Sequence, residues 1–428
     1  MYDWANSVYS LTITSAIFPI FYTAITREDG VDLVEQRYNI PSQSLYSFTL
    51  SFGFLIVAII TPLLAGIADH TGSKKKFLKF FCYLGSISCA GLFFFDMDHF
   101  WLGMSFVVLA CIGFSASLIF YDAYLPEIAE PKDHDRVSAQ GYTMGYIGSV
   151  ILLVLNLIMV MKPDLFGIPE DGGLPARLTF VTVGIWWAGF AQIPFKRLPD
   201  NIYGQKAGTD YIKKGYVELK KVWDQLKRTK RLKRYLMAFF VFNCGIQTIM
   251  YLAVIYAEQE IKQVNDAGEI VPISSENLII SILIIQLVAA VGAFLFFKLS
   301  GVLGNIRSLM IAAVIWIMVC AVGYYIEFAN AFYMMAAMVG LVMGGSQALS
   351  RSTYSKFLPE TIDHASYFSF YDVCYYVGTV LGTAVFGAVL GITGDLRYTI
   401  VAIGGFFVLG LILFLRVPKN EVELAVKV

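Results

Sequence analysis

Residues 124–127 are Tyr-Leu-Pro-Glu, and residues 357–360 are Phe-Leu-Pro-Glu. Each copy closes a long apolar segment, and a short polar loop follows it. A glycine-spaced apolar segment comes after each loop, Gly141-Tyr142-Thr143-Met144-Gly145-Tyr146-Ile147-Gly148 in one case and Tyr375-Tyr376-Val377-Gly378-Thr379-Val380-Leu381-Gly382 in the other. The copies lie about half the chain length apart. Agreement in sequence, position and flanking pattern predicts an internal duplication with two similar halves.

Around these copies, twelve segments are long and apolar enough to cross a bilayer, which takes about 20 residues in a helix. We expect them near residues 5–25, 44–68, 77–95, 100–124, 137–160, 177–195, 235–257, 276–298, 308–326, 331–354, 365–390 and 397–415. Only 15% of the residues are charged, against about 25% in soluble domains. Six spans per half make the halves a parallel repeat. The sequence predicts an all-α membrane protein with two six-helix bundles.

The loop charges set the orientation, because cytoplasmic loops of membrane proteins are enriched in Lys and Arg. With the N-terminus inside, nearly all basic residues fall on the inner side. The exceptions are Arg27, Arg37, Lys162, Arg177, Lys262 and Arg397. The sequence therefore predicts that both termini are cytoplasmic and that the protein lies in the cytoplasmic membrane. The first span begins close to Met1, and we expect it to remain as an uncleaved anchor.

A basic, hydrophilic segment separates the halves. We expect an N-terminal bundle at 1–195, a cytoplasmic linker at 196–234 and a C-terminal bundle at 235–428. Within the linker, apolar residues recur at helical spacing from Tyr211 to Leu226. This pattern predicts a basic amphipathic helix over 210–228 that lies on the inner leaflet. A solvated linker with partial helicity is the alternative.

The loop after the second span resembles the signature of the major facilitator superfamily through Asp69, Gly72 and Lys74. A closer resemblance is to its vacuole effluxer-like branch, which includes autophagy-related amino-acid effluxers and bacterial proteins. The segments that carry it are Tyr2-Asp3-Trp4-Ala5-Asn6-Ser7, Ala123-Tyr124-Leu125-Pro126-Glu127, Asn243-Cys244-Gly245-Ile246-Gln247-Thr248 and Gly344-Gly345-Ser346-Gln347-Ala348-Leu349-Ser350-Arg351-Ser352. The resemblance implies the major facilitator fold, with amino acids as a candidate substrate class.

Charged residues inside spans are costly and are candidates for function. Arg351 is predicted to bind an anionic group or to pair with Asp122 or Asp372; snorkelling to the inner surface is the alternative. Asp3, Asp122 and Asp372 are candidates for charge pairing or coupling, and helix-end capping or contact with inner water is the alternative for each. Asp69, Gly72 and Lys74 are predicted to form an inner latch. The lysines after Asp69 fit a purely topological role equally well.

Uncharged polar residues on spans one, four, seven and ten are candidates for a midplane substrate pathway between the halves. Interhelical hydrogen bonding is the alternative for each of them. The complete set, with the arginine, is Asn6, Tyr9, Thr12, Tyr121, Asn243, Gln247, Tyr251, Gln347 and Arg351.

The sequence contains none of the nucleotide-binding, metalloprotease or serine-hydrolase motifs. It therefore predicts no enzyme, no cofactor and no metal site. The leading hypothesis is a monomeric secondary transporter that moves a small solute by alternating access, with a proton or other ion as a candidate coupling partner. The expected partners are a small solute and the lipid bilayer, and no nucleic acid is expected. A non-transporting sensor or scaffold of the same fold and a drug–proton exporter are the alternatives.

The orientation can be tested with single cysteines at positions 214 and 228 in a cysteine-free background. Both positions lie in the basic linker, so a membrane-impermeant maleimide should leave them unlabelled in intact cells and label them after permeabilisation. A cysteine at position 262, which the charge pattern places outside, is the matched control and should react in intact cells. Labelling of 214 or 228 from outside would reverse the predicted orientation.

Overall fold

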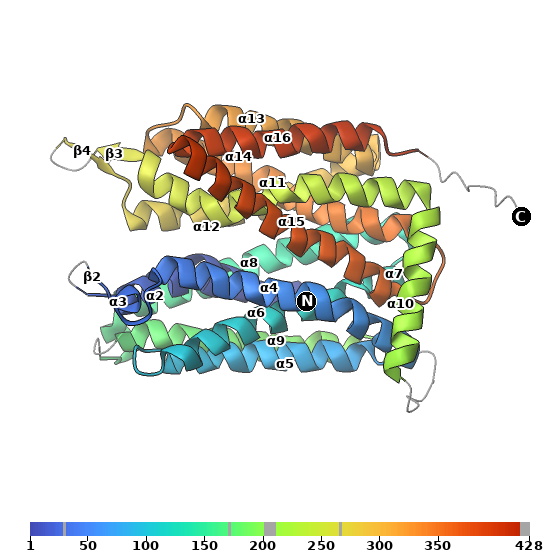
Figure 1. The fold of residues 1–428 in the computed structure, drawn as a ribbon, viewed down its shortest axis with the longest axis horizontal. Coiled ribbons are helices and arrows are strands. Elements are labelled where there is room, and N and C mark those ends of the chain that lie inside the picture. Colours follow the sequence, from blue (N-terminus) through green and yellow to red (C-terminus); the bar gives the residue numbers. More distant parts are fainter. Residues whose placement is uncertain (29–30, 170–172, 201–210, 265–267, 420–428) are drawn as a thin grey trace, which may run out of the picture. The chain divides into compact units, whose positions relative to one another are not determined.

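The computed structural model describes residues 1–28, 31–169, 173–200, 211–264 and 268–419. The chain forms two compact units. Unit 1 comprises Met1–Asp122 and Met144–Tyr216, and unit 2 comprises Ala123–Thr143 and Val217–Val428. The first part of one helix from the N-terminal half of the chain therefore belongs to unit 2 (Figure 1).

Helices make up almost all of both units. Unit 1 contains α1 (Tyr2–Val8), a π-helix η1 (Tyr9–Ala16), α2 (Ile17–Thr26), β1 (Arg27–Glu28), β2 (Val31–Asp32), α3 (Leu33–Tyr38), α4 (Ser42–Thr71), α5 (Lys74–Gly91), η2 (Leu92–Phe94), α6 (Phe100–Asp122), η4 (Pro163–Phe166) and α9 (Leu174–Arg197). Unit 2 contains α7 (Leu125–Ile128), η3 (Pro131–Asp133), α11 (Lys230–Glu260), β3 (Lys262–Val264), β4 (Ile270–Pro272), α12 (Ser275–Leu303), α13 (Asn305–Gly323), α14 (Ala329–Phe357), α15 (His364–Thr393) and α16 (Leu396–Leu415). Two helices, α8 (His134–Met161) and α10 (Tyr211–Arg228), begin in one unit and end in the other. The strands form two short antiparallel hairpins.

The spans agree with the sequence prediction. Within the described ranges, eleven helical segments are long and apolar enough to cross a membrane. A twelfth, α11, is bent by 46° between Met250 and Ala253. Counting α11 as one span confirms the expected twelve. A helix pairs most of its backbone polar groups internally, which lets a chain cross hydrocarbon. Membrane helices also tolerate internal prolines such as Pro62 in α4 and Pro194 in α9.

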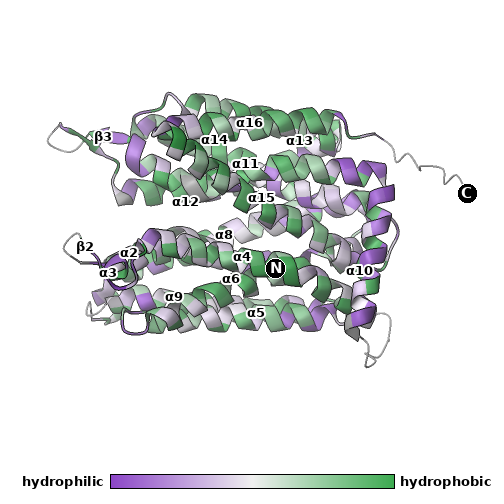
Figure 2. Cartoon of the chain, in the orientation of Figure 1, coloured by the Kyte–Doolittle hydropathy of each residue, from purple (hydrophilic) through white to green (hydrophobic). Residues whose placement is uncertain are grey.

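Each unit has its own helix packing. In unit 1, α5 lies between α6 and α9, and α4 packs against α6. In unit 2, α12 packs against α14, while α11 packs against α15 and α16. Most of the helical ribbon is hydrophobic (Figure 2). Many large apolar side chains on these helices are exposed, among them Phe48, Ile59, Ile87, Ile185, Met237 and Leu415. Such an apolar exterior suits a lipid environment and would be unusual on a soluble monomer.

The closest helix pair is α12 with α14, and glycines make it possible. A Cβ atom on Gly344 would lie 2.0 Å from the carbonyl oxygen of Ala289. One on Gly292, from the α12 side, would lie 2.1 Å from the carbonyl oxygen of Leu341. The backbones of the two helices are thus in direct contact, and small residues of this kind are typical of helix interfaces in membranes.

Gly344→Ala should therefore lower the thermal unfolding temperature of the purified protein, because the new methyl group meets fixed backbone atoms. Overpacking of this kind costs about 1–3 kcal/mol. Gly301→Ala in α12 is the matched control, since a Cβ atom at this position would have no other atom within 4 Å. That variant should be as stable as the parent or slightly more stable, because Ala favours helix more than Gly does. Equal melting of both variants would argue against the backbone contact.

The predicted linker helix is present as α10, and part of its apolar side is buried within the protein. Its position on the inner leaflet stays a prediction. Val222 and Leu226, which the sequence pattern assigned to the membrane surface, are buried in the protein. The same part of α10 meets α15, where the rings of Trp223 and Phe370 lie 5.3 Å apart. The hydroxyl of Tyr367 donates to Gln225 at 2.9 Å. Part of the apolar face that the sequence pattern predicts for the membrane surface is therefore covered by protein.

Candidate functional site

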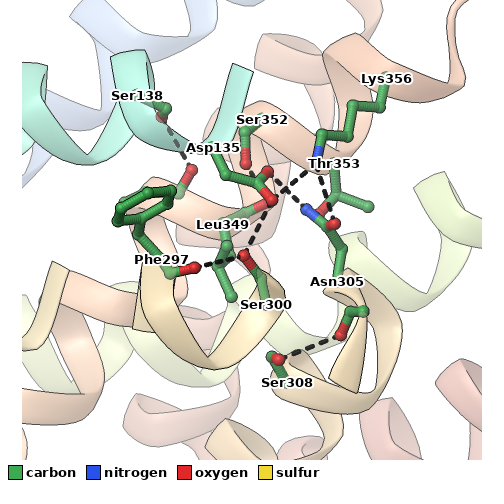
Figure 3. Close-up of polar contacts among 12 residues, drawn as sticks. Asp135, Ser138, Phe297, Ser300, Asn305, Ser308, Leu349, Ser352, Thr353 and Lys356 are labelled. Carbon is green, nitrogen blue, oxygen red and sulfur yellow. Dashed lines mark hydrogen bonds and ion pairs between the residues drawn. The ribbon is translucent and has the colours of Figure 1, made fainter. Parts of the chain in front are cut away.

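A buried ion cluster joins the first turns of α8 to three other helices of unit 2 (Figure 3). The Asp135 carboxylate accepts from Lys356 Nζ at 2.6 Å and from Ser300 Oγ at 2.8 Å on one oxygen. Its other oxygen accepts from Asn305 Nδ2 at 2.7 Å. The Asp135 side chain is only 7% exposed. A carboxylate so deep has to be neutralised and hydrogen-bonded, and this cluster supplies both.

Asn305 and Lys356 also contact each other. The amide nitrogen of Asn305 donates to Thr353 Oγ1 at 3.0 Å, and its amide oxygen accepts from Lys356 at 3.1 Å. Asn305 begins α13 and follows the eighth span, at the place that corresponds in the second half to the signature loop after the second span. In the first half, Asp69 supplies the acid in that loop. In the second half the loop supplies an amide instead, and the acid comes from α8.

Arg351 precedes Lys356 on α14 and is 3% exposed. Its Nε donates to Ser138 Oγ at 3.0 Å, and a terminal nitrogen donates to the Ser138 carbonyl oxygen at 3.2 Å. The guanidinium carbon lies 4.3 Å from the centre of the Tyr142 ring. This two-pronged and stacked geometry is specific to arginine. Pairing of Arg351 with Asp122 or Asp372 stays a prediction.

Small residues bring these helices close enough for the polar contacts. Ala139 of α8, Ala293 of α12 and Ala348 of α14 pack together in the core of unit 2. Ser138 Oγ donates to the carbonyl oxygen of Ala348 at 2.8 Å, and Thr143 Oγ1 donates to that of Ala290 at 3.1 Å. The junction of α8 with α12 and α14 is therefore built from alanine, hydroxyl groups and ions.

A second pair involves the repeated Leu-Pro-Glu motif. His364 Nδ1, at the start of α15, lies 3.0 Å from the Glu127 carboxylate. Both side chains are largely buried. The motif marked the duplication in the sequence, and nothing in its pattern indicated a contact with α15.

In unit 1, the predicted residues form a separate polar group. Tyr121 donates to the Asp3 carboxylate at 2.5 Å. Tyr9 and Thr12 lie in the π-helix η1, and both are buried. Thr12 Oγ1 and Asn6 Nδ2 have no hydrogen-bond partner among the described residues. π-Helical turns are rare and are frequently found at functional sites, and the sequence pattern did not predict this one.

The predicted polar residues of unit 2 form hydrogen bonds with neighbouring groups. Asn243 Nδ2 donates to the Tyr375 carbonyl oxygen at 3.1 Å, and Gln247 Nε2 donates to Asn243 Oδ1 at 3.1 Å. Gln347 Nε2 lies 3.2 Å from the Met250 sulfur. Tyr251 lies in α11. The contacts of Asn243 with Tyr375 and of Gln347 with Met250 join different helices, as the alternative predicts, whereas that of Gln247 with Asn243 lies within α11. A shared substrate pathway remains a prediction.

The remaining predicted residues lie near helix ends. Asp122 ends α6 and Asp372 lies in α15, and both are buried. Gly72 closes α4 with a φ of 65°, and its N–H donates to the Asp69 carbonyl oxygen at 3.3 Å. Lys74 begins α5. The signature glycine thus has a structural role as a left-handed helix cap, while the latch role of Asp69 stays a prediction.

A double-mutant cycle of Asp135→Asn and Lys356→Met should reveal a coupling energy of about 1–3 kcal/mol, because one removed partner leaves the other charge buried. The measurement is the thermal unfolding of all four proteins in detergent. The Glu130–Lys132 pair is the control, with an ion-pair distance of 2.7 Å but side chains that are 70% and 75% exposed. That pair should give a coupling near zero. Equal coupling energies in both pairs would mean that burial of the Asp135 cluster adds nothing to the stability of the ion pair.

Comparisons with known proteins agree with this architecture. The family model described as "Vacuole effluxer Atg22 like" matches residues 1–423. An uncharacterised MFS-type transporter, YxiO of Bacillus subtilis, is 30% identical over 98% of this chain and 94% of its own length. Autophagy-related protein 22-1 of Penicillium rubens is 23% identical over 90% of this chain and 76% of that protein.

Solved structures give the same fold at low sequence identity. FucP, a major facilitator superfamily transporter crystallised in the outward conformation, superimposes with a TM-score of 0.69 over 98% of both chains. The proton:xylose symporter XylE gives 0.67 over 98% of this chain and 94% of that one. Identity is 13% in both cases, so these likenesses bear on the fold alone.

Proposed function

Because this chain belongs to the vacuole effluxer Atg22-like family of major facilitator transporters, we propose that it moves a small solute across the cytoplasmic membrane by alternating access. The protein is a multi-pass membrane transporter and not an enzyme. We further propose that it acts as a monomer with both termini in the cytoplasm. The substrate class, the coupling ion and the pathway residues belong to this proposal.

The observation that carries the mechanism is the polar character of the α8 junction. A helix from the N-terminal half meets α12 and α14 through one ion pair, an arginine, hydroxyl groups and alanines. Large side chains that interdigitate would resist separation of the helices, because moving the helices apart would remove many close contacts together. Polar groups can exchange their partners for water when a cavity opens. This contact is therefore suited to repeated opening and closing.

The proposed substrate is an amino acid or a similar zwitterion. Arg351 stays charged at every physiological pH, and planar guanidinium groups recognise carboxylates. Asn6 and Thr12 offer uncharged polar groups on span one that have no partner in the described structure. Within unit 2, a ligand with a carboxylate fits Arg351 better than a large aromatic drug does. The polar groups of unit 1, taken by themselves, favour a solute without net charge.

The function is tested by purified protein in liposomes, screened for uptake and efflux of amino acids with and without a pH gradient. Arg351→Lys should keep the fold but lose at least about tenfold in transport rate, because lysine keeps the charge but not the two-pronged contact with Ser138. Arg307→Lys is the matched control, since Arg307 is exposed on α13. It should transport at the parental rate.

The outcomes separate the hypotheses. Transport that depends on the pH gradient would identify a proton as the coupling ion. Parental transport by a correctly folded Arg351→Lys protein would remove Arg351 from the mechanism. Absence of transport for every amino acid tested, by folded parental protein, would favour another solute class or a non-transporting membrane protein.

A further inference from the structure

A run of positive charge lies where α10 ends and α11 begins. Residues 227–234 are Lys-Arg-Thr-Lys-Arg-Leu-Lys-Arg, with six cations and no acid. Leu232 is fully buried and anchors the segment to unit 2. Lys227, Arg228 and Lys233 are exposed, and Lys230 is partly exposed. The cations are therefore held in place by the fold while their charged ends remain accessible.

Two of the arginines have structural tasks. The Arg231 guanidinium lies 3.8 Å above the Phe357 ring. Arg234 donates to the Arg416 carbonyl oxygen at 2.9 Å and so caps the end of α16. This contact also brings Arg416 to the same corner. The lysines at 227, 230 and 233 form no ion pair with an acid in the described part of the chain.

The neighbouring Lys221 shows the contrast. It lies 2.5 Å from Glu218 and 3.0 Å from Asp363. These two carboxylates, Glu218 foremost, raise the pKa of Lys221. The charge of Lys221 is therefore neutralised by carboxylates of the protein, whereas the described structure shows no carboxylate that pairs with Lys227, Lys230 or Lys233.

Lipid-facing residues adjoin this corner. Met237, one helical turn along α11 from Lys233, is 60% exposed. Leu415, directly before Arg416, is 65% exposed. Apolar residues this open lie against acyl chains in a membrane span, so the cations just beyond them lie at the depth of the headgroups. The N-terminal end of α11 adds the positive end of a helix dipole.

An aromatic side chain completes the corner. Trp223 is 42% exposed, and the Lys227 ammonium lies 4.9 Å from its ring. Tryptophan is favoured where one edge meets hydrocarbon and the other meets water. Figure 2 shows the hydrophilic residues of α10 next to the apolar surface of the spans.

We propose that Lys227, Lys230 and Lys233, with Trp223 beside them, bind the phosphate headgroup of an anionic phospholipid in the adjoining leaflet. The site is independent of the transported solute. A cluster of cations directly flanking a membrane helix is attracted to anionic lipid, and each contributes a factor of about five in affinity. Because only the non-helical Thr229 separates α10 from α11, an occupied site also holds the linker helix at the membrane.

The test uses the full-length protein in neutral detergent, titrated with phosphatidylglycerol or phosphatidylcholine carrying the same brominated acyl chain. Bromine quenches tryptophan fluorescence at short range, and the difference between the parent and Trp223→Phe isolates the signal of Trp223. We expect quenching of Trp223 at lower concentrations of phosphatidylglycerol than of phosphatidylcholine. Lys227→Gln, Lys230→Gln and Lys233→Gln together should weaken the preference at least about tenfold.

The matched control removes the same number of exposed cations elsewhere on the predicted cytoplasmic side, through Lys76→Gln, Lys132→Gln and Lys298→Gln. It should keep the full preference. Lys230→Gln alone, with an expected loss of about fivefold, covers the case in which the triple variant does not fold. Equal quenching by the two lipids, or equal loss in the control, would overturn the proposal. So would displacement of the lipid by millimolar inorganic phosphate, which would indicate a site for the free anion.

Discussion

An ionised carboxylate cannot remain buried without a counter-charge and hydrogen-bond donors, and the environment of Asp135 follows from that requirement. Its oxygens are met by groups from α12, α13 and α14. Removing water from such a group costs several kcal/mol, and only close, well-aligned partners offset the cost. The four helices must therefore keep one mutual arrangement for the cluster to exist. Arg351, five residues before Lys356 on α14, likewise requires α8 and α14 to stay close, because it contacts Ser138 and Tyr142.

The glycines and alanines of unit 2 follow from the short reach of these polar groups. A serine hydroxyl extends only a short distance from the backbone, so Ser138 can reach the Ala348 carbonyl oxygen only if α8 and α14 nearly touch. Ala139, Ala293 and Ala348 permit that approach, and Gly344 permits the still closer contact of α14 with α12. Hydrophobic burial cannot drive such packing in lipid, where the surroundings are equally apolar. Close packing of complementary shapes and hydrogen bonds between the helices stabilise their association instead.

Span length and apolar composition predicted the helices, and short quoted segments such as Tyr2-Asp3-Trp4-Ala5-Asn6-Ser7 carried the resemblance to the family. Both are properties of consecutive residues. The ion cluster could not be predicted from the sequence, because its members are far apart in the chain: Asp135, Asn305 and Lys356. Each of them, considered alone, fits an ordinary loop or helix-end position. The amphipathic pattern of α10 was recognised, but Val222 and Leu226 are buried in protein. Periodicity identifies an apolar face without identifying what covers it.

The π-helix in span one shows the same limit. From Tyr9 to Ala16 the helix is wound more widely than an α-helix, and it returns to the ordinary form at Ile17. The local sequence weakens an ordinary α-helix here, because residues 12–15 are Thr-Ile-Thr-Ser and Pro19 has no N–H to donate to the Ser15 carbonyl oxygen. The wider winding turns Tyr9 and Thr12 relative to Asp3 and Asn6, which lie in the preceding α-helical turns. The first span therefore carries two polar groups in differently wound segments: Asp3, which Tyr121 contacts, in α1, and Tyr9 with Thr12 in the π-helix.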